Sequence, residues 1–163
     1  MPKMATKAAG NVFYQARMAA ATWNDKLKSR EGAAEITGID RTRLAYIELE
    51  TINPHPDEVL ILADAYNAPE LYNHFCANVC TLGRCTIRPV ELQALEKTTL
   101  QLLLSFQNIP VLKDQLIQIA ADGVIDKTEE SQMKQILKQL DDAAAQIDTL
   151  KLFCQKRFCN WTN

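Results

Sequence analysis

A regular apolar stripe in the last part of the chain limits the fold more than any other feature of the sequence. Apolar residues recur there at alternating intervals of three and four: Met133, Ile136, Leu140, Ala143, Ile147, Leu150 and Cys154. Such spacing lines one side of an α-helix and is typical of the seam along which two helices pack. The sequence therefore predicts a long C-terminal helix whose seam lies against another helix, within the chain or in a second copy.

The rest of the chain also favours helices. Alternation of apolar and polar residues is missing, and the β-branched residues are scattered. Ser29 and Asp40 are suited to helix N-termini, Gly38 to a helix C-terminus and Pro54 to a break between helices. Helices are expected over about 11–23, 29–37, 41–49, 57–66 and 70–79. The predicted fold class is all-α.

The character of the sequence changes between residues 83 and 88, where Gly83 and Pro89 bracket a short polar stretch. Pro89 and Pro110 each suit the start of a helix, and Asp126 with Glu129 predicts a capping box before the last helix. Two domains are expected, joined by a linker at 83–88. They are a five-helix domain over 1–82 and a helical hairpin or three-helix module over 89–163.

The charge balance disfavours a protein that coats nucleic acid indiscriminately. The 163 residues carry 18 basic and 20 acidic side chains, for a net charge of −2. A DNA contact therefore needs basic residues gathered on one face. The chain also lacks an apolar stretch long enough for a membrane helix or for the core of a signal peptide, which predicts a cytoplasmic protein without a membrane partner.

Signatures of catalysis are missing from the sequence. The chain has two histidines and three serines, without the spacings of a nucleophile elbow, a phosphate-binding loop or a zinc-protease helix. His55 lies between two prolines, and His74 lies beside Asn73 and Phe75, so neither histidine has a neighbouring nucleophile. Neither enzymatic activity nor a cofactor is expected.

The five cysteines are expected to be reduced, as is usual in the cytoplasm. The spacing of Cys76, Cys80 and Cys85 matches neither a zinc pair nor an iron–sulfur motif, although His74 could complete four metal ligands with them. The favoured interpretation is that Cys76 and Cys80, one turn apart, are small apolar residues at a helix end. A thiol- or metal-responsive regulator remains an alternative that would use this set.

Residues 29–54 predict a short helix, a turn with a glycine, and a second helix. Ala34 on the first helix permits close approach of Ile39 in the turn and Leu44 on the second helix. Two helices held by a tight turn leave the outer face of the second helix free to enter the major groove of DNA. That face offers four side chains near its N-terminal end: Arg41, Thr42, Arg43 and Tyr46.

This stretch resembles the helix-turn-helix of the phage repressor and Cro class, also called the xenobiotic-response-element (XRE) family. The residues that carry the resemblance are Ser29-Arg30, Ala34, Gly38, Ile39-Asp40, Leu44, Ile47-Glu48 and Asn53-Pro54. Residues 59–66 resemble the closing helix of the family, so that the resemblance covers about residues 11–75. It implies a sequence-specific transcriptional regulator, a homodimeric repressor that binds a palindromic operator in double-stranded DNA.

The resemblance also implies which residues bind DNA: Ser29, Arg30, Arg41, Thr42, Arg43, Tyr46 and Asn53. Arg30 contacts a phosphate or an outer base, and Arg41 and Thr42 read bases. Tyr46 adds an inner contact or meets a thymine methyl group, and Arg43 serves bases or phosphate. Ser29 and Asn53 help to hold the DNA backbone.

Three places in the sequence depart from the family pattern. Gly32 and Ala33 replace bulkier residues in the helix over 29–37, which weakens its local stability. Leu49-Glu50 stands where the family has a glycine after the recognition helix, so the helix must end by another geometry or bring negative charge near the phosphates. Trp23 stands where an arginine often pairs with the equivalent of Glu48, so this ion pair is either lost or made by Arg17.

The second half of the chain resembles no family that we can name. It is expected to be a dimerisation or effector module, with the apolar seam as the dimer contact. The alternative is that the whole chain is a protein-interaction module, such as an antitoxin or an assembly partner, whose helical tail binds another protein.

Overall fold

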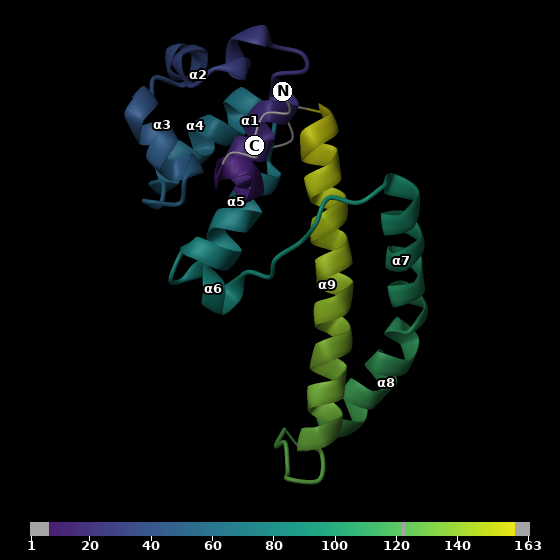
Figure 1. The fold of residues 1–163 in the computed structure, drawn as a ribbon. Helices are drawn as coiled ribbons and strands as arrows, with labels where there is room; N and C mark the ends of the chain where they lie inside the picture. The colour runs from purple at the N-terminus through teal and green to yellow at the C-terminus, as the bar shows by residue number, and fades with distance from the viewer. Residues whose placement is uncertain (1–6, 122, 159–163) are drawn as a thin grey trace. The chain divides into compact units, whose positions relative to one another are not determined.

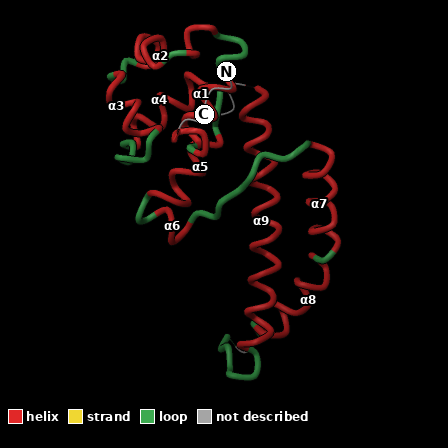
Figure 2. The backbone as a smooth tube through the Cα atoms, in the orientation of Figure 1, coloured by secondary structure: helices red, strands yellow, loops and turns green. Residues whose placement is uncertain are grey.

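The computed structural model describes residues 7–121 and 123–158, and within them it contains helices and loops but no strand (Figures 1 and 2). The all-α class is thereby confirmed. The chain divides between Pro89 and Val90 into two compact units, which are described separately.

The first unit consists of short helices. They are the 3₁₀-helix η1 (Lys7–Gly10), α1 (Val12–Ala20), the 3₁₀-helix η2 (Asp25–Lys28), α2 (Arg30–Thr37), α3 (Arg41–Glu48), α4 (Pro56–Tyr66), α5 (Glu70–His74), the π-helical turn η3 (Phe75–Val79) and α6 (Gly83–Thr86). Their apolar sides meet in one core, whose largest fully buried side chains include Leu27, Leu44, Ile47, Leu62 and Leu71. The observed helices match the five expected ones, with α1 ending three residues early at Ala20.

Local signals begin and end these helices as the sequence predicts. The Ser29 hydroxyl accepts a hydrogen bond from the Gly32 N–H at 3.0 Å, and the Asp40 carboxylate accepts from Thr42 N–H at 2.7 Å. Gly38 ends α2 with a φ of 70°, a left-handed conformation in which a side chain is strained. These caps fix the lengths of α2 and α3 and the turn between them.

Helix α3 ends without the glycine that is usual at this point in the repressors it resembles. Glu50 adopts a φ of 58° and so takes up the left-handed conformation itself. The next residue, Thr51, donates its N–H to the Tyr46 carbonyl at 2.9 Å, which closes the helix end. The geometry is the one that glycine favours, obtained here at a cost in backbone strain.

The predicted linker at 83–88 is wrong in its first part, because α6 occupies Gly83–Thr86 and belongs to the first unit. The physical reason is a close backbone contact. A Cβ on Gly83 would lie 2.1 Å from the Cys76 carbonyl oxygen, so glycine allows this turn to pack directly on the preceding helix.

The second unit contains α7 (Leu95–Gln107), α8 (Ile109–Ile119) and α9 (Glu130–Phe158). The expectation that Pro89 begins a helix is wrong, because α7 starts six residues later. Arg88, the residue before this proline, has no side-chain oxygen with which to cap a helix. The capping box before α9 is confirmed: Asp126 accepts from the Glu129 N–H at 2.9 Å, and the Glu129 carboxylate accepts from the Asp126 N–H at 3.2 Å.

The apolar seam of α9 is partly used within the chain. Ile136 is buried with Leu112 and Ile119 of α8, and Met133 packs at the edge of this cluster. The remaining seam residues are half-buried or exposed: Leu140, Ala143, Ile147, Leu150 and Cys154. The prediction that α9 packs on another helix is therefore confirmed at its N-terminal end, and a dimer contact along the rest stays a prediction.

Candidate nucleic-acid interface

The angle between α2 and α3 is held by contacts around the turn that joins them. Thr37 at the end of α2 donates its hydroxyl to the Ala33 carbonyl at 2.8 Å and accepts the Ile39 N–H at 3.2 Å. Ile39 and Leu44 are both buried in the core, so the turn and the inner side of α3 are anchored together. This is the arrangement that the helix-turn-helix pattern predicts.

Gly32, like Gly83, lies where two backbone segments pack too closely for a side chain. A Cβ at this position would lie 2.1 Å from the Lys26 carbonyl oxygen, so α2 and η2 approach each other backbone to backbone. Glycine inside a helix ordinarily weakens it. Here the absence of a side chain is what allows α2 to pack against η2.

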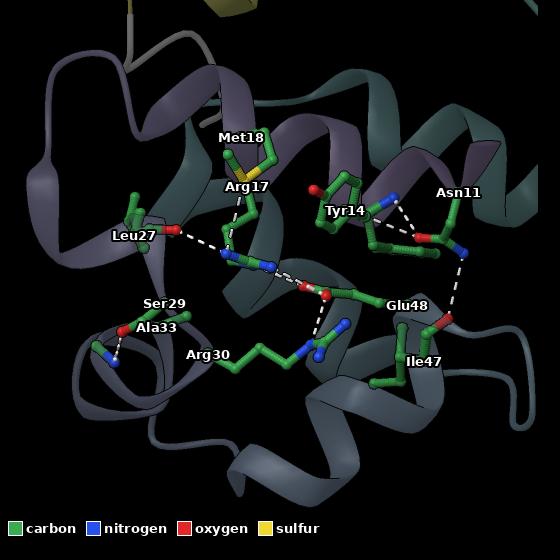
Figure 3. Close-up of polar contacts among 12 residues, drawn as sticks. Asn11, Tyr14, Arg17, Met18, Leu27, Ser29, Arg30, Ala33, Ile47 and Glu48 are labelled. Atoms are coloured by element: carbon green, nitrogen blue, oxygen red, sulfur yellow. Dashed lines mark hydrogen bonds and ion pairs between the residues drawn. The ribbon is translucent and has the colours of Figure 1, made fainter. Parts of the chain in front are cut away.

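A buried carboxylate, that of Glu48, joins α1, α2 and α3 (Figure 3). Arg17 of α1 donates to both oxygens, from Nε at 2.6 Å and from Nη2 at 3.0 Å, and gives a further hydrogen bond to the Leu27 carbonyl at 2.8 Å. Arg30 of α2 donates from Nε to the same carboxylate at 2.7 Å. Of the two alternatives at this position, the structure therefore has the pair made by Arg17, and Trp23 is exposed.

The electrostatics of this cluster favour the charged form of Arg17 and the neutral form of Tyr66, since the pKa of each group is raised. Burial disfavours the charge of Arg17, but the hydrogen bond and the negative charge of Glu48 outweigh it, and the pKa of the guanidinium is raised. Burial and the charge of Glu48 raise the pKa of the Tyr66 phenol. Its hydroxyl is buried without a hydrogen-bond partner among the described residues. The cluster thus fixes the core side of the α2–α3 unit by charge as well as by packing.

Asn11 fixes α3 from a second direction (Figure 3). Its side-chain oxygen caps α1 by accepting from the Phe13 N–H at 2.9 Å, and its Nδ2 donates to the Ile47 carbonyl near the end of α3 at 3.2 Å. One buried side chain therefore joins the beginning of α1 to the end of α3. Sequence reasoning missed this role, because a helix cap carries no local mark of a second, distant partner.

Three of the predicted DNA-binding residues are exposed on α3: Arg41, Thr42 and Tyr46. Thr42 and Tyr46 lie one turn apart on the side of the helix opposite the buried Leu44 and Ile47, and Arg41 lies at the N-terminal end of the helix. Arg41 forms an ion pair with Glu31 of α2, with 2.6 Å between Nε and Oε1. These three residues are consequently accessible, but Arg41 already has a carboxylate neighbour.

Arg43 lies apart from this group, because its guanidinium forks onto Glu58 of α4. Nε and Nη2 of Arg43 each donate to one carboxylate oxygen, the latter at 2.8 Å, and Glu58 also accepts the His55 N–H at 2.6 Å. The hydrogen bond from Arg43 lowers the pKa of the Glu58 carboxyl, against the opposite effect of burial. The structure therefore gives Arg43 a role that sequence reasoning missed, as a link between α3 and α4.

The other predicted DNA-binding residues lie at helix ends. Ser29 caps α2, Arg30 is partly buried on Glu48, and Asn53 is exposed between α3 and α4. All three predicted arginines are thus ion-paired, and residues 25–58 contain five Lys or Arg against eight Asp or Glu. This surface is not a basic patch, so an affinity for DNA must come from directed contacts more than from net charge.

The cysteine set does not form a metal site in the part of the chain that the structure describes. No group of three or more His, Cys, Asp or Glu side chains is placed there to hold an ion. Cys80 accepts the Gly83 N–H at 3.4 Å, and Cys85 donates its thiol hydrogen to the Thr81 carbonyl at 3.6 Å. His74 packs edge-on against Phe13, and burial lowers its pKa. Cys76 and Cys80 are partly buried and pack against the core of the first unit, as the favoured interpretation expects, whereas Cys85 is exposed.

Comparisons with known proteins give no match, whether with protein-family models, curated proteins or solved structures. Over residues 7–121 and 123–158, no helix is both long enough and apolar enough to cross a membrane.

Proposed function

We propose that this protein is a sequence-specific DNA-binding transcriptional regulator that reads base edges with α3. The observation that carries the proposal is the contrast between the two sides of this helix. Leu44 and Ile47 are buried in the core, whereas Thr42 and Tyr46 are exposed on the opposite side and Arg41 is exposed at the N-terminal end. A rigidly held helix with one free side is suited to the major groove.

The exposed residues have the chemistry that base edges require. Arg41 can donate two parallel hydrogen bonds to O6 and N7 of a guanine, and the Thr42 hydroxyl can donate or accept. Tyr46, one turn further along α3, can meet the methyl group of a thymine. Phosphate contacts are proposed for residues at or beyond helix ends, Ser29, Arg30 and Asn53, and for Arg43 on the side of α3 that faces α4. For Arg43 such a contact requires the phosphate to displace Glu58.

The proposal includes a symmetric homodimer that acts as a repressor on a palindromic operator. Large apolar side chains that are exposed in the second unit support a partner: Leu100, Leu103, Leu104, Ile117, Leu140 and Ile147. Exposed apolar surface of this kind is uncommon on monomeric proteins. Two copies of α3 about 34 Å apart would match successive turns of the major groove.

Selection from a pool of random DNA duplexes tests the proposal directly. The intact protein should enrich one motif with two related halves. Replacing Arg41 with Ala should weaken binding to the selected duplex by about 1–3 kcal/mol and relax the preference at one base position in each half. Arg84→Ala, a change of the same charge at an exposed position in α6, should leave the motif unchanged.

A protein-interaction module is the second candidate, and the acidic balance of residues 25–58 favours it. Proteins that bind DNA chiefly through phosphates need an excess of basic residues, and this surface has none. The same selection separates the two functions. Failure of the intact protein to enrich any motif would support the interaction module and contradict DNA reading.

A further inference from the structure

Arg41 is not a free cation, although it is the exposed arginine best placed to read a base. Its partner, Glu31, lies in the first turn of α2, and 2.6 Å separates Nε of the arginine from Oε1 of the carboxylate. Both side chains remain open to solvent, with 65% of Arg41 and 60% of Glu31 exposed. The pair therefore lies on the surface that the proposed function assigns to DNA.

Glu31 contacts the Arg41 guanidinium at Nε, and this determines which N–H donors remain available to DNA. A guanidinium has five N–H donors in a rigid fork, and a carboxylate at Nε leaves the end formed by Nη1 and Nη2 able to donate elsewhere. Recognition of guanine by arginine uses two parallel hydrogen bonds, to O6 and N7. Glu31 and a guanine can thus bind Arg41 at the same time, from different directions.

A phosphate contact is different, because it places a second anion near Glu31. If Arg41 turns to a phosphate, it must leave the carboxylate, and Glu31 then lies close to the negatively charged DNA backbone. Both effects disfavour a contact of Arg41 with phosphate. Neither effect applies when Arg41 stays on Glu31 and meets a base edge.

We propose that Glu31 is a specificity-determining residue, which orients Arg41 toward a guanine and disfavours its contact with phosphate. This inference rests on the proposed function and deepens it. Glu31 would lower the affinity for DNA of arbitrary sequence while leaving the affinity for the cognate site nearly intact. Specificity depends on this difference rather than on the absolute affinity.

Glu35 provides a matched control on the same helix. It pairs with Lys26 at 3.1 Å, and both side chains are 66% exposed. Its replacement by Gln removes the same single negative charge as replacement of Glu31, but without altering the surroundings of Arg41. Surface ion pairs of this kind contribute little to stability, so neither variant should unfold the protein.

The experiment compares Glu31→Gln, Glu35→Gln and the intact protein on two duplexes of equal length. One duplex is the sequence that the intact protein selects from a random pool, and the other has a mixed sequence. Glu31→Gln should bind the mixed duplex more tightly and reduce the affinity ratio between the two duplexes by about tenfold, the scale of one base contact. Glu35→Gln should leave this ratio unchanged.

A double-mutant cycle distinguishes the orientation of Arg41 from a general effect of removing a negative charge near the DNA. In an Arg41→Ala background, Glu31→Gln should have no effect on the ratio, because the oriented side chain is gone. An unchanged ratio in Glu31→Gln alone, or an equal fall in Glu35→Gln, would overturn the role of Glu31. Failure of the intact protein to select any duplex would overturn the proposed function itself, and this inference with it.

Discussion

Arg17 and Glu48, 31 residues apart in the sequence, form a buried bidentate ion pair with N–O distances of 2.6 and 3.0 Å. Their side chains are only 3% and 2% exposed. Removing one partner of a buried ion pair leaves the other charge buried without compensation, which is strongly destabilising. The helix-turn-helix unit is therefore attached to α1 by an interaction that tolerates little change.

Replacing Glu48 with Gln should destabilise the protein by about 3–5 kcal/mol, because it leaves two arginines without their shared counter-charge. Urea denaturation followed by circular dichroism measures the change. Glu35→Gln, which removes an exposed carboxylate from α2, should change the free energy of unfolding by less than about 0.5 kcal/mol. Equal effects of the two substitutions would contradict the role given to the buried cluster.

Replacing Glu50 with Gly should stabilise the protein by about 0.5–1 kcal/mol. Glu50 has a φ of 58°, and relief of this strain by glycine exceeds the entropy that glycine loses on folding. Thermal unfolding of Glu50→Gly and Glu50→Ala separates strain from charge, since alanine removes the charge and keeps the strain. If alanine raised the melting temperature as much as glycine, the strain at this position would be refuted.

The Arg43–Glu58 pair should make stability depend on pH in the acidic range. The hydrogen bond from Arg43 lowers the pKa of Glu58 in the folded state, against the effect of burial. Such a group contributes stability that is fully present above the unfolded pKa, about 4.3, and is lost as the pH falls through the folded pKa. We expect the free energy of unfolding to decrease as the pH falls from about 5 to about 3.

Two variants isolate this contribution of Glu58. Glu58→Gln should reduce the pH dependence in that window, leaving the part contributed by Asp40 and Asp126, whose pKa values are also lowered. Asp57→Asn on the same helix should leave most of the dependence. Denaturation curves at closely spaced pH values provide the measurement. A pH profile of Glu58→Gln that runs parallel to that of the intact protein would show that this pair does not cause the effect.

The sequence predicts the parts of this fold that depend on neighbouring residues. Ser29, Gly38 and Asp40 mark the ends of α2 and α3, because each acts on backbone groups within three or four residues. Gly83 shows the limit of such reasoning. Its contact with the Cys76 carbonyl depends on how two segments meet, so a position predicted as linker is part of the packed unit.

The candidate site is predicted less completely than the fold. The resemblance to repressors identifies the exposed side of α3, but it treats the arginines as free cations. Each arginine has an acidic partner on another helix: Arg30 pairs with Glu48, Arg41 with Glu31 and Arg43 with Glu58, at separations of 18, 10 and 15 residues. Side-chain pairs across a tertiary contact have no fixed spacing in the sequence, so they become visible only in the structure.

In the apolar seam of α9, Leu140 and Ile147 remain 39% and 36% exposed. If this seam joins two copies of the chain, the intact protein should be a dimer at micromolar concentration in light scattering. Replacing both residues with Glu should produce a folded monomer, because two charges on each copy would have to be buried in the contact.

Leu137 supplies the matched control, because it is 51% exposed on the same helix but lies outside the seam. Leu137→Glu should leave the dimer intact and the helical content unchanged. When the selected duplex is added, light scattering should show weaker binding only for the variant with Glu at both Leu140 and Ile147. A monomer carries one copy of α3, which reaches only half of a palindromic site. A monomeric intact protein would refute the dimer, and a dimer that survives both seam substitutions would place the contact on another surface.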